Sequence, residues 1–63
     1  MMKGSIKAYS KAVNAGVIAG EDGRTYKFMN SHWQGPNTPQ ANDIVIFDGK
    51  GTNAANVRRL ETV

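Results

Sequence analysis

Two Asp-Gly pairs, Asp22-Gly23 and Asp48-Gly49, constrain the fold of this chain more than any other feature. An Asp-Gly pair tolerates the positive φ angles of a tight hairpin turn, and each pair is flanked by short runs that suit β-strands. The run Asp-Ile-Val-Ile-Phe at residues 43–47 is too short for a helix and rich in β-branched side chains. The pattern therefore predicts one hairpin around Glu21-Asp22-Gly23 and a second around residues 48–51.

The other segments complete an all-β pattern. The predicted strands are Lys3–Ser10, Ala15–Gly20, Arg24–Met29, Asp43–Phe47 and Ala54–Leu60. In the first strand two sets of side chains alternate, Gly4, Ile6 and Ala8 against Ser5, Lys7 and Tyr9. In the third, Tyr26 and Phe28 lie on one face and Lys27 and Met29 on the other.

The stretch Ser31–Ala41 contains both prolines and is expected to be irregular, with one helical turn at Ser31–Gln34. Five short strands in 63 residues favour a small five-stranded antiparallel barrel over a sandwich. Closure removes the exposed edges that make a small sheet prone to association. We expect one all-β domain that spans residues 1–63.

Charge and cysteine content narrow the choice of partners. The chain has no cysteine, so disulfides, thiolate nucleophiles and cysteine-bound zinc are excluded, and a cytoplasmic location is expected. The net charge of +3 favours polyanionic partners, although eight basic residues also suit an ordinary solubilising surface. No apolar stretch approaches the roughly 20 residues that span a bilayer, so no membrane partner is expected.

Short motifs with the order and spacing of a known family extend over nearly the whole chain. They are Gly4–Ser10, Gly16-Val17-Ile18, Asp22-Gly23, residues 42–47 and Gly51-Thr52-Asn53-Ala54-Ala55-Asn56-Val57. The last is similar to the closing Gly-Pro-Gln-Ala-x-Asn-Val of cold-shock domains, which the chain as a whole resembles. The resemblance implies a compact OB-fold barrel that binds single-stranded RNA or DNA.

The chain departs from that family on one surface. Ala15 and Val17 stand where cold-shock domains have base-stacking phenylalanines, and Ala8 replaces a tryptophan. Lys27, Met29 and Asn30 replace outward Phe and His residues of the second RNA-binding motif. A stacked base contributes about 1–3 kcal/mol, so losing three or more such sites removes on the order of 3–9 kcal/mol of binding free energy. Any binding is therefore expected to be weak and largely electrostatic.

The side chains expected to contact nucleic acid are those left on the face of the first three strands and at its rim. They are Lys7, Tyr9, Lys11, Val17, Lys27, Met29 and Arg58. The lysines would follow phosphates, and Tyr9 would stack on a base. The alternatives are that the lysines form a solvated sheet face and that Tyr9 packs at the edge of the barrel.

A protein partner is the second hypothesis for the same residues. Ala15, Val17 and Met29 form an apolar patch rimmed by lysines, and methionine adapts to varied partners. On this hypothesis the domain is an interaction module or a small regulator.

The remaining candidates indicate no catalysis. Trp33 is expected to plug the barrel, the alternative being an exposed binding residue. His32 has no cysteine or second histidine to join it, so no metal site is predicted. The acidic residues fall mainly in predicted turns, and no glycine-rich phosphate loop is present. We therefore expect a non-enzymatic protein without a cofactor.

Overall fold

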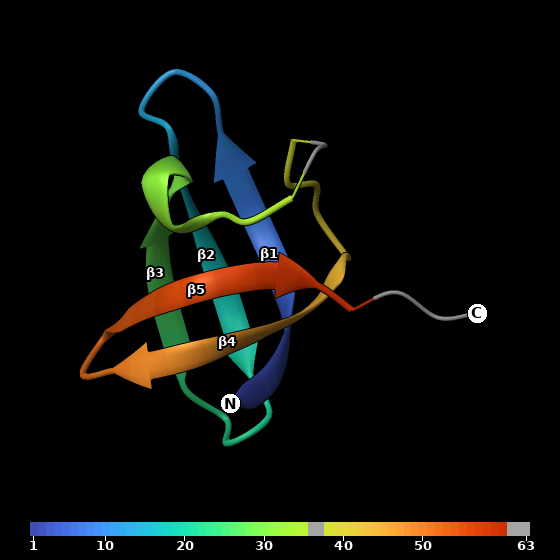
Figure 1. Cartoon of the computed structure of the whole chain (residues 1–63), viewed down its shortest axis with the longest axis vertical. Coiled ribbons are helices and arrows are strands. Elements are labelled where there is room, and N and C mark those ends of the chain that lie inside the picture. The colour runs from blue at the N-terminus through green and yellow to red at the C-terminus, as the bar shows by residue number, and fades with distance from the viewer. Residues whose placement is uncertain (36–37, 61–63) are drawn as a thin grey trace.

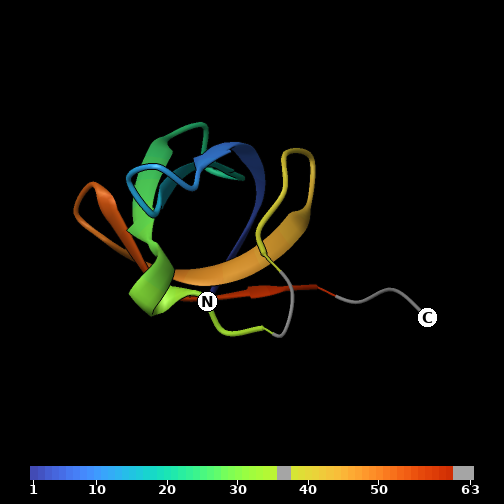
Figure 2. The same ribbon diagram turned by 90° about the horizontal axis from the view of Figure 1, so that it is seen from above.

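The strands of this protein close into a barrel. The structure is a computed structural model that describes residues 1–35 and 38–60. Its elements are β1 (Met2–Ser10), β2 (Ala15–Gly20), β3 (Thr25–Met29), the 3-10 helix η1 (Asn30–His32), β4 (Ile44–Lys50) and β5 (Asn53–Arg59). The strands follow each other around the ring as β1-β2-β3-β5-β4 (Figures 1 and 2). The predicted all-β, five-stranded barrel is confirmed.

One strand pairing differs from the expected antiparallel pattern. β3 and β5 run parallel and share a single residue pair, Lys27 with Asn53, whereas the other four pairings are antiparallel. A closed ring with an odd number of strands cannot alternate direction at every step, so at least one neighbouring pair has to be parallel. The β3–β5 seam is where this barrel places it.

A bulge in β1 reverses the alternation of its side chains. Ile6 pairs with Ile18 and Ala8 with Val17, which leaves Lys7 as the extra residue. An extra residue shifts every later side chain to the opposite face. Tyr9 is therefore turned toward the core and Ala8 outward, so the predicted alternation is correct up to Ile6 and wrong beyond it.

The core consists of one cluster of side chains that are almost completely inaccessible to solvent. Its members are Ile6, Ile18, Tyr26, Phe28, Val45, Phe47, Ala54 and Val57. The predicted division of the third strand is confirmed, because Tyr26 and Phe28 are buried while Lys27 and Met29 are exposed. Aromatic rings fill the middle of the barrel, with Tyr26 and Phe47 centroids 5.1 Å apart.

The second hairpin turns later than the sequence predicts. β4 continues through Asp48 and Gly49 to Lys50, and the turn lies at Gly51, whose φ is +63°. Gly49 serves close packing instead, since a Cβ there would lie 3.1 Å from Cε2 of Tyr26. The Asp48-Gly49 pair therefore marks a tight contact inside a strand.

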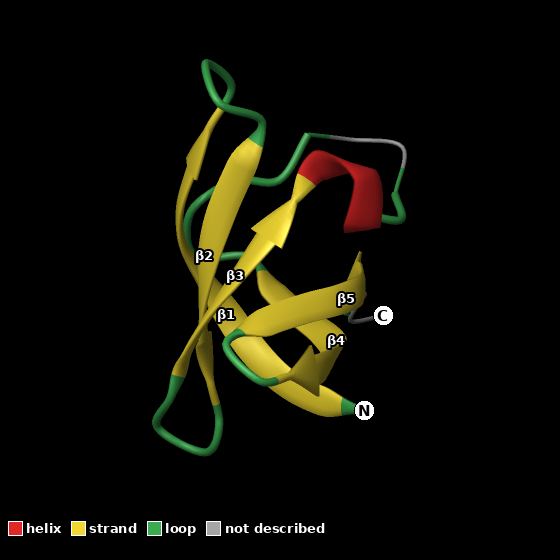
Figure 3. Cartoon of the chain, turned by 90° about the vertical axis from the view of Figure 1, so that its left-hand side faces the viewer, coloured by secondary structure: helices red, strands yellow, loops and turns green. Residues whose placement is uncertain are grey.

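The described part of the connection from β3 to β4 begins with η1 at one end of the barrel (Figure 3). The predicted helical turn appears as η1 at Asn30–His32, and the predicted irregular stretch includes residues 36 and 37, which lie outside the described residues. Trp33 is half-buried, packs against the core and bridges to Val57, as a plug would. Its ring centroid lies 6.3 Å from that of Phe28.

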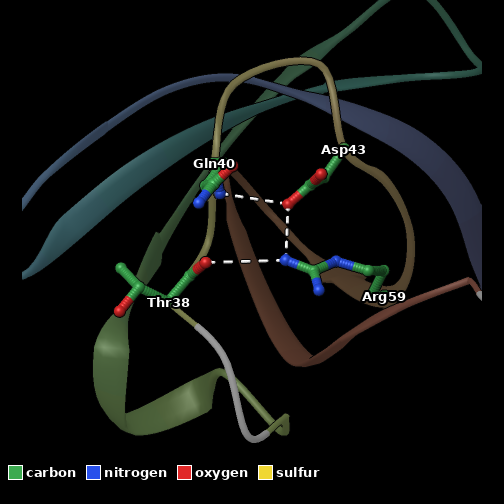
Figure 4. A network of polar contacts seen from close by, with 4 residues as sticks. All are labelled: Thr38, Gln40, Asp43 and Arg59. Carbon is green, nitrogen blue, oxygen red and sulfur yellow. Dashed lines mark hydrogen bonds and ion pairs between the residues drawn. The ribbon is translucent and has the colours of Figure 1, made fainter.

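An ion pair fastens the rest of that connection to β5 (Figure 4). Nη2 of Arg59 donates to Oδ2 of Asp43 at 2.8 Å and lies 3.5 Å from the carbonyl oxygen of Thr38. The backbone N–H of Gln40 donates to the same Asp43 oxygen at 3.1 Å. The guanidinium of Arg59 also lies 5.7 Å from the centroid of the Trp33 ring. The Arg59 side chain thus contacts the connection both at Trp33 and at Thr38 and Asp43.

Within the described part of the chain, no helix is long and apolar enough to cross a bilayer.

Candidate nucleic-acid interface

The outer face of β1, β2 and β3 is organised in rows across the strands. One row is Ala8, Val17 and Lys27, and the next is Ser10, Ala15 and Met29. These side chains point away from the core because their neighbours along each strand, such as Ile18 and Phe28, point into it. Val17, Lys27 and Met29 therefore share one face, as expected.

Lys27 stands between two hollows of this surface. The strand-face hollow is lined by residues of β1, β2, β3 and the β1–β2 loop: Ala8, Tyr9, Ser10, Val13, Ala15, Gly16, Val17 and Lys27. The seam hollow is lined chiefly by Lys27, Met29, His32, Lys50, Asn53 and Ala55, and encloses about 520 Å³. Both are mostly apolar, and Ala15 and Lys27 contribute to both.

The seam hollow lies between the one contact of β3 with β5 and the point where the chain after η1 reaches β5 again. At one end the N–H of Lys27 donates to the carbonyl of Thr52 at 2.9 Å. At the other, Trp33 bridges to Val57 and the N–H of Gln34 donates to the carbonyl of Val57 at 2.7 Å. The parallel seam that an odd-numbered ring requires thus provides an opening beside the exposed face of β3.

The charges around the two hollows are of one sign. Lys27 and Lys50 line the seam hollow with His32, and no carboxylate among the described residues lines either hollow. Met29, the last residue of β3, is 57% exposed, and Val13, in the β1–β2 loop, is 65% exposed. The surface therefore offers apolar contact area with ammonium groups at its edges.

Tyr9 packs at the edge of the barrel. Its ring centroid lies 6.0 Å from that of Phe28 with 21° between the planes, and its hydroxyl donates to Oδ1 of Asn30 at 3.2 Å. The bulge at Lys7 produces this orientation. The structure thus favours the edge-packing alternative over a free stacking platform, although part of the ring still lines the strand-face hollow.

Lys7 and Lys11 lie beyond Tyr9, away from Lys27. Both are exposed and line a separate hollow against residues 38–41 of the β3–β4 connection. They extend the basic surface past β1. The sequence had suggested that they flank Val17 and Met29, and they do not.

Arg58 does not join this face. Arg58 of β5 pairs with Ile46 of β4, and Ile46 pairs on its other side with Lys3 of β1. The three side chains point outward on the side of the barrel opposite to the face of β2 and β3. In Figure 1 the strands β4 and β5 cross in front of β1–β3, and the side view of Figure 3 separates the same two layers. Arg59, the neighbour of Arg58 in β5, forms an ion pair with Asp43.

The sequence analysis did not identify several residues that line the hollows and that would matter for binding there. They are Val13, His32 as a lining residue, Lys50 and Asn53. Lys50 and Asn53 flank the β4–β5 turn, and only the ring order of the strands brings that turn beside β3. Val13 carried a usable signal, since it is an apolar residue in a loop with no strand partner to bury it.

The resolved pKa shifts belong to the β2–β3 turn. The hydroxyl of Tyr26 donates to Oδ2 of Asp22 at 2.6 Å, and the N–H of Arg24 donates to Oδ1 at 3.0 Å. These bonds hold the pKa of Asp22 below its ordinary value of 3.8, the Tyr26 bond contributing most. The same bond raises the pKa of Tyr26 above its ordinary value of 10.0. The two hydrogen bonds to Asp22 together stabilise the turn.

No model of a known protein family matches the chain, and no curated protein matches its sequence significantly.

Proposed function

We infer that this protein binds single-stranded RNA or DNA weakly, through the outer face of β1–β3 and the adjoining seam hollow. The observation that carries the proposal is the position of Lys27 at two apolar hollows, one of which Lys50 also lines. Single-strand binding surfaces combine apolar contact for bases with cations that follow the backbone. The resemblance to cold-shock domains supports the same face.

Weak binding follows from the chemistry of the exposed side chains. Val17, Ala15 and Met29 occupy the outward positions of β2 and β3, while the rings of Phe28 and Tyr26 face the core. Bases therefore meet aliphatic side chains and a thioether, which lack the stacking energy of an aromatic ring. The affinity depends mainly on phosphate contacts made by the lysines.

This dependence makes salt the informative variable. For single strands, log K falls with log[salt] with a slope of about −0.7 per phosphate contact, so contacts by Lys27 and Lys50 give a slope of about −1.4. A fourfold rise in salt should then weaken binding about sevenfold. Fluorescence anisotropy with labelled oligo-dT and oligo-U measures this directly, and duplex DNA serves as the competitor.

Lys27→Glu is the variant that tests the site, and Lys3→Glu is its matched control. Both change the net charge equally and both positions are exposed, but Lys3 lies on the β4 side of the barrel. Lys27→Glu should weaken binding and reduce the salt slope by more than Lys3→Glu does. Equal effects from the two variants would mean that only overall charge matters, and the proposed face would have to be abandoned.

An interaction with a protein through the same patch is the second candidate. The 57% exposure of Met29 and the 65% exposure of Val13 favour it, since large exposed apolar side chains suit a protein surface. A partner bound with an unchanged affinity over the same salt range, together with no oligonucleotide binding at low salt, would select this candidate.

The proposed setting is the reducing cytoplasm that a cysteine-free chain suits.

A further inference from the structure

The outer surface of β1, β4 and β5 carries apolar and basic side chains that the proposed function does not use. We call it the β4 face, and its residues are Met1, Lys3, Ile44, Ile46, Arg58 and Leu60. In Figures 1 and 3 this layer lies on the opposite side of the barrel from β2 and β3. A ligand on the β4 face therefore does not compete with one on the strand-face hollow.

Strand register fixes how these residues are arranged. Ile46 is the centre of a row that has Lys3 on one side and Arg58 on the other. In the next row Ile44 lies beside Ser5, and the N–H of Leu60 donates to the carbonyl of Ile44 at 2.8 Å. Ile44 is 41% exposed and Met1 74% exposed, whereas Ile46 is half-buried, so the open aliphatic area of the face lies chiefly at Ile44 and Met1.

Lys3 and Arg58, the two cations of the face, form no ion pair with a carboxylate of the described residues. The ion pair found there joins Arg59 to Asp43. The nearest polar contact of Arg58 is with the Met1 sulfur, 4.0 Å from its Nη2. The acid at the end of the face, Asp48, accepts a hydrogen bond from Nδ2 of Asn56 at 3.1 Å. Among the described residues, the face thus presents positive charge without an ion-pair partner on both sides of an isoleucine.

We propose that the β4 face docks an acidic amphipathic segment of a partner protein. Charge complementarity selects the acid, because carboxylates on both sides of an apolar residue match the row Lys3–Ile46–Arg58. A second copy of this chain would place like charges against each other across a two-fold axis, which opposes association. A nucleic acid would meet branched aliphatic side chains without a ring on which to stack.

The row also sets the spacing that the partner needs. Lys3 and Arg58 are separated by two strand positions, and neighbouring strands lie about 4.8 Å apart, so their backbone positions are about 10 Å apart. Two turns of an α-helix rise by about 10.5 Å over seven residues. A helix with acidic residues at i and i+7 and apolar residues at i+3 and i+4 would place carboxylates over both cations and apolar side chains over Ile46 and Ile44.

The probe is a synthetic alanine-rich peptide with glutamates at i and i+7 and leucines at i+3 and i+4, titrated into the ¹⁵N-labelled full chain. We expect saturable amide shifts centred on Lys3, Ile44, Ile46 and Arg58. A peptide with lysines in place of the glutamates should bind about tenfold more weakly or not at all. The double variant Lys3→Glu/Arg58→Glu should reverse that order of preference.

Two controls keep the result interpretable. Lys50→Glu, on the seam hollow, should leave peptide binding unchanged, and Ile44→Ser should weaken it without a large loss of thermal stability because that side chain is already exposed. The proposal is overturned if the acidic peptide gives no saturable shifts, if the shifts fall on β2 and β3, or if both peptides bind alike. It is also overturned if sedimentation shows a dimer that Ile46→Lys disperses, or if oligo-dT shifts the β4 face.

Discussion

Gly16 lies where two aromatic rings meet across β2. It pairs with Tyr9 on one side and Phe28 on the other, and those rings are stacked over its position. A Cβ on Gly16 would lie 2.7 Å from Cε1 and Cζ of Phe28 and 2.9 Å from the carbonyl oxygen of Ala8. The absence of a side chain is what lets the rings close this end of the barrel under the strand-face hollow.

Gly16→Ala should therefore destabilise the protein by overpacking. Forcing a methyl group into a packed core costs about 1–3 kcal/mol of the free energy of unfolding, which lowers the Tm of a domain this small by about 4–8 °C for each kcal/mol. Thermal unfolding followed by circular dichroism measures the shift. In a double-mutant cycle with Phe28→Leu the two effects should be less than additive. A Tm equal to that of the native chain would show that the rings move aside freely.

Asp22 gives a pH dependence with a defined sign. Its pKa is lowered in the folded protein by the Tyr26 hydroxyl, so the folded state binds a proton less readily than the unfolded state does. The stability that this bond contributes is present above the ordinary pKa of 3.8 and is lost as the pH falls through the lower folded value. Asp22→Asn should reduce stability at neutral pH and flatten the loss of stability in acid.

The matched control is Glu21→Gln, which removes a charge from the exposed neighbouring position. It should leave the acid limb of the stability curve nearly unchanged. Parallel curves for the native chain and Asp22→Asn below pH 3.8 would contradict the assigned role of the Tyr26–Asp22 bond.

At the scale of elements, the β3–β4 connection depends on a single carboxylate. Asp43 accepts hydrogen bonds from Arg59 and Gln40, while its backbone carbonyl accepts from the N–H of Ile6 at 2.9 Å (Figure 4). The connection is thereby joined to β5 and β1 at once. Its attachment keeps Arg59 beside Trp33 and so keeps the plug in place.

Asp43→Ala should lower the free energy of unfolding by about 1.5–3 kcal/mol, the range for hydrogen bonds to charged groups. Asp43→Asn should cost less, because the amide oxygen still accepts from Gln40. Chemical denaturation of both variants, alone and combined with Arg59→Met, measures the coupling. If Asp43→Ala and Asp43→Asn were equally stable, the carboxylate would not be what secures the connection.

The elements themselves were largely predictable from the sequence, since turn residues and alternation identify the strands. β2 was predicted with its observed bounds, and the faces of Tyr26 and Phe28 were correct. The bulge at Lys7 was not predictable, because no residue type marks an extra residue in a strand. It turns Tyr9 toward the core, where the ring packs at the edge of the barrel. The second hairpin was predicted around residues 48–51, but its turn begins only at Gly51, because Asp48 and Gly49 belong to β4 and Gly49 packs against Tyr26.

The candidate site was only partly predictable, and the reason is topological. Val17, Lys27 and Met29 lie together because β2 and β3 are neighbours in sequence and in the sheet. Lys50 joins them, and Arg58 leaves them, because of where β4 and β5 cross in the closed ring. Local patterns specify which way a side chain points but not which distant strand lies next to it.

At the scale of the whole molecule, the barrel presents two surfaces with different chemistry. The face of β1–β3 and the seam hollow place lysines around apolar hollows, whereas the β4 face places cations around isoleucines. The net charge of the whole chain is +3, and it speeds the approach of an anionic partner to either surface. The side chains at contact then determine which anion binds where.

We propose that single-stranded nucleic acid binds where β2, β3 and the seam hollow meet. Amide chemical-shift mapping of the ¹⁵N-labelled chain with oligo-dT and oligo-U at low salt is the direct test of this proposal. We expect salt-sensitive shifts at Val17, Lys27, Met29, Lys50 and Asn53, and small shifts at Lys3 and Ile46. Shifts that are absent at low salt, or that centre on Lys3 and Ile46, would contradict it.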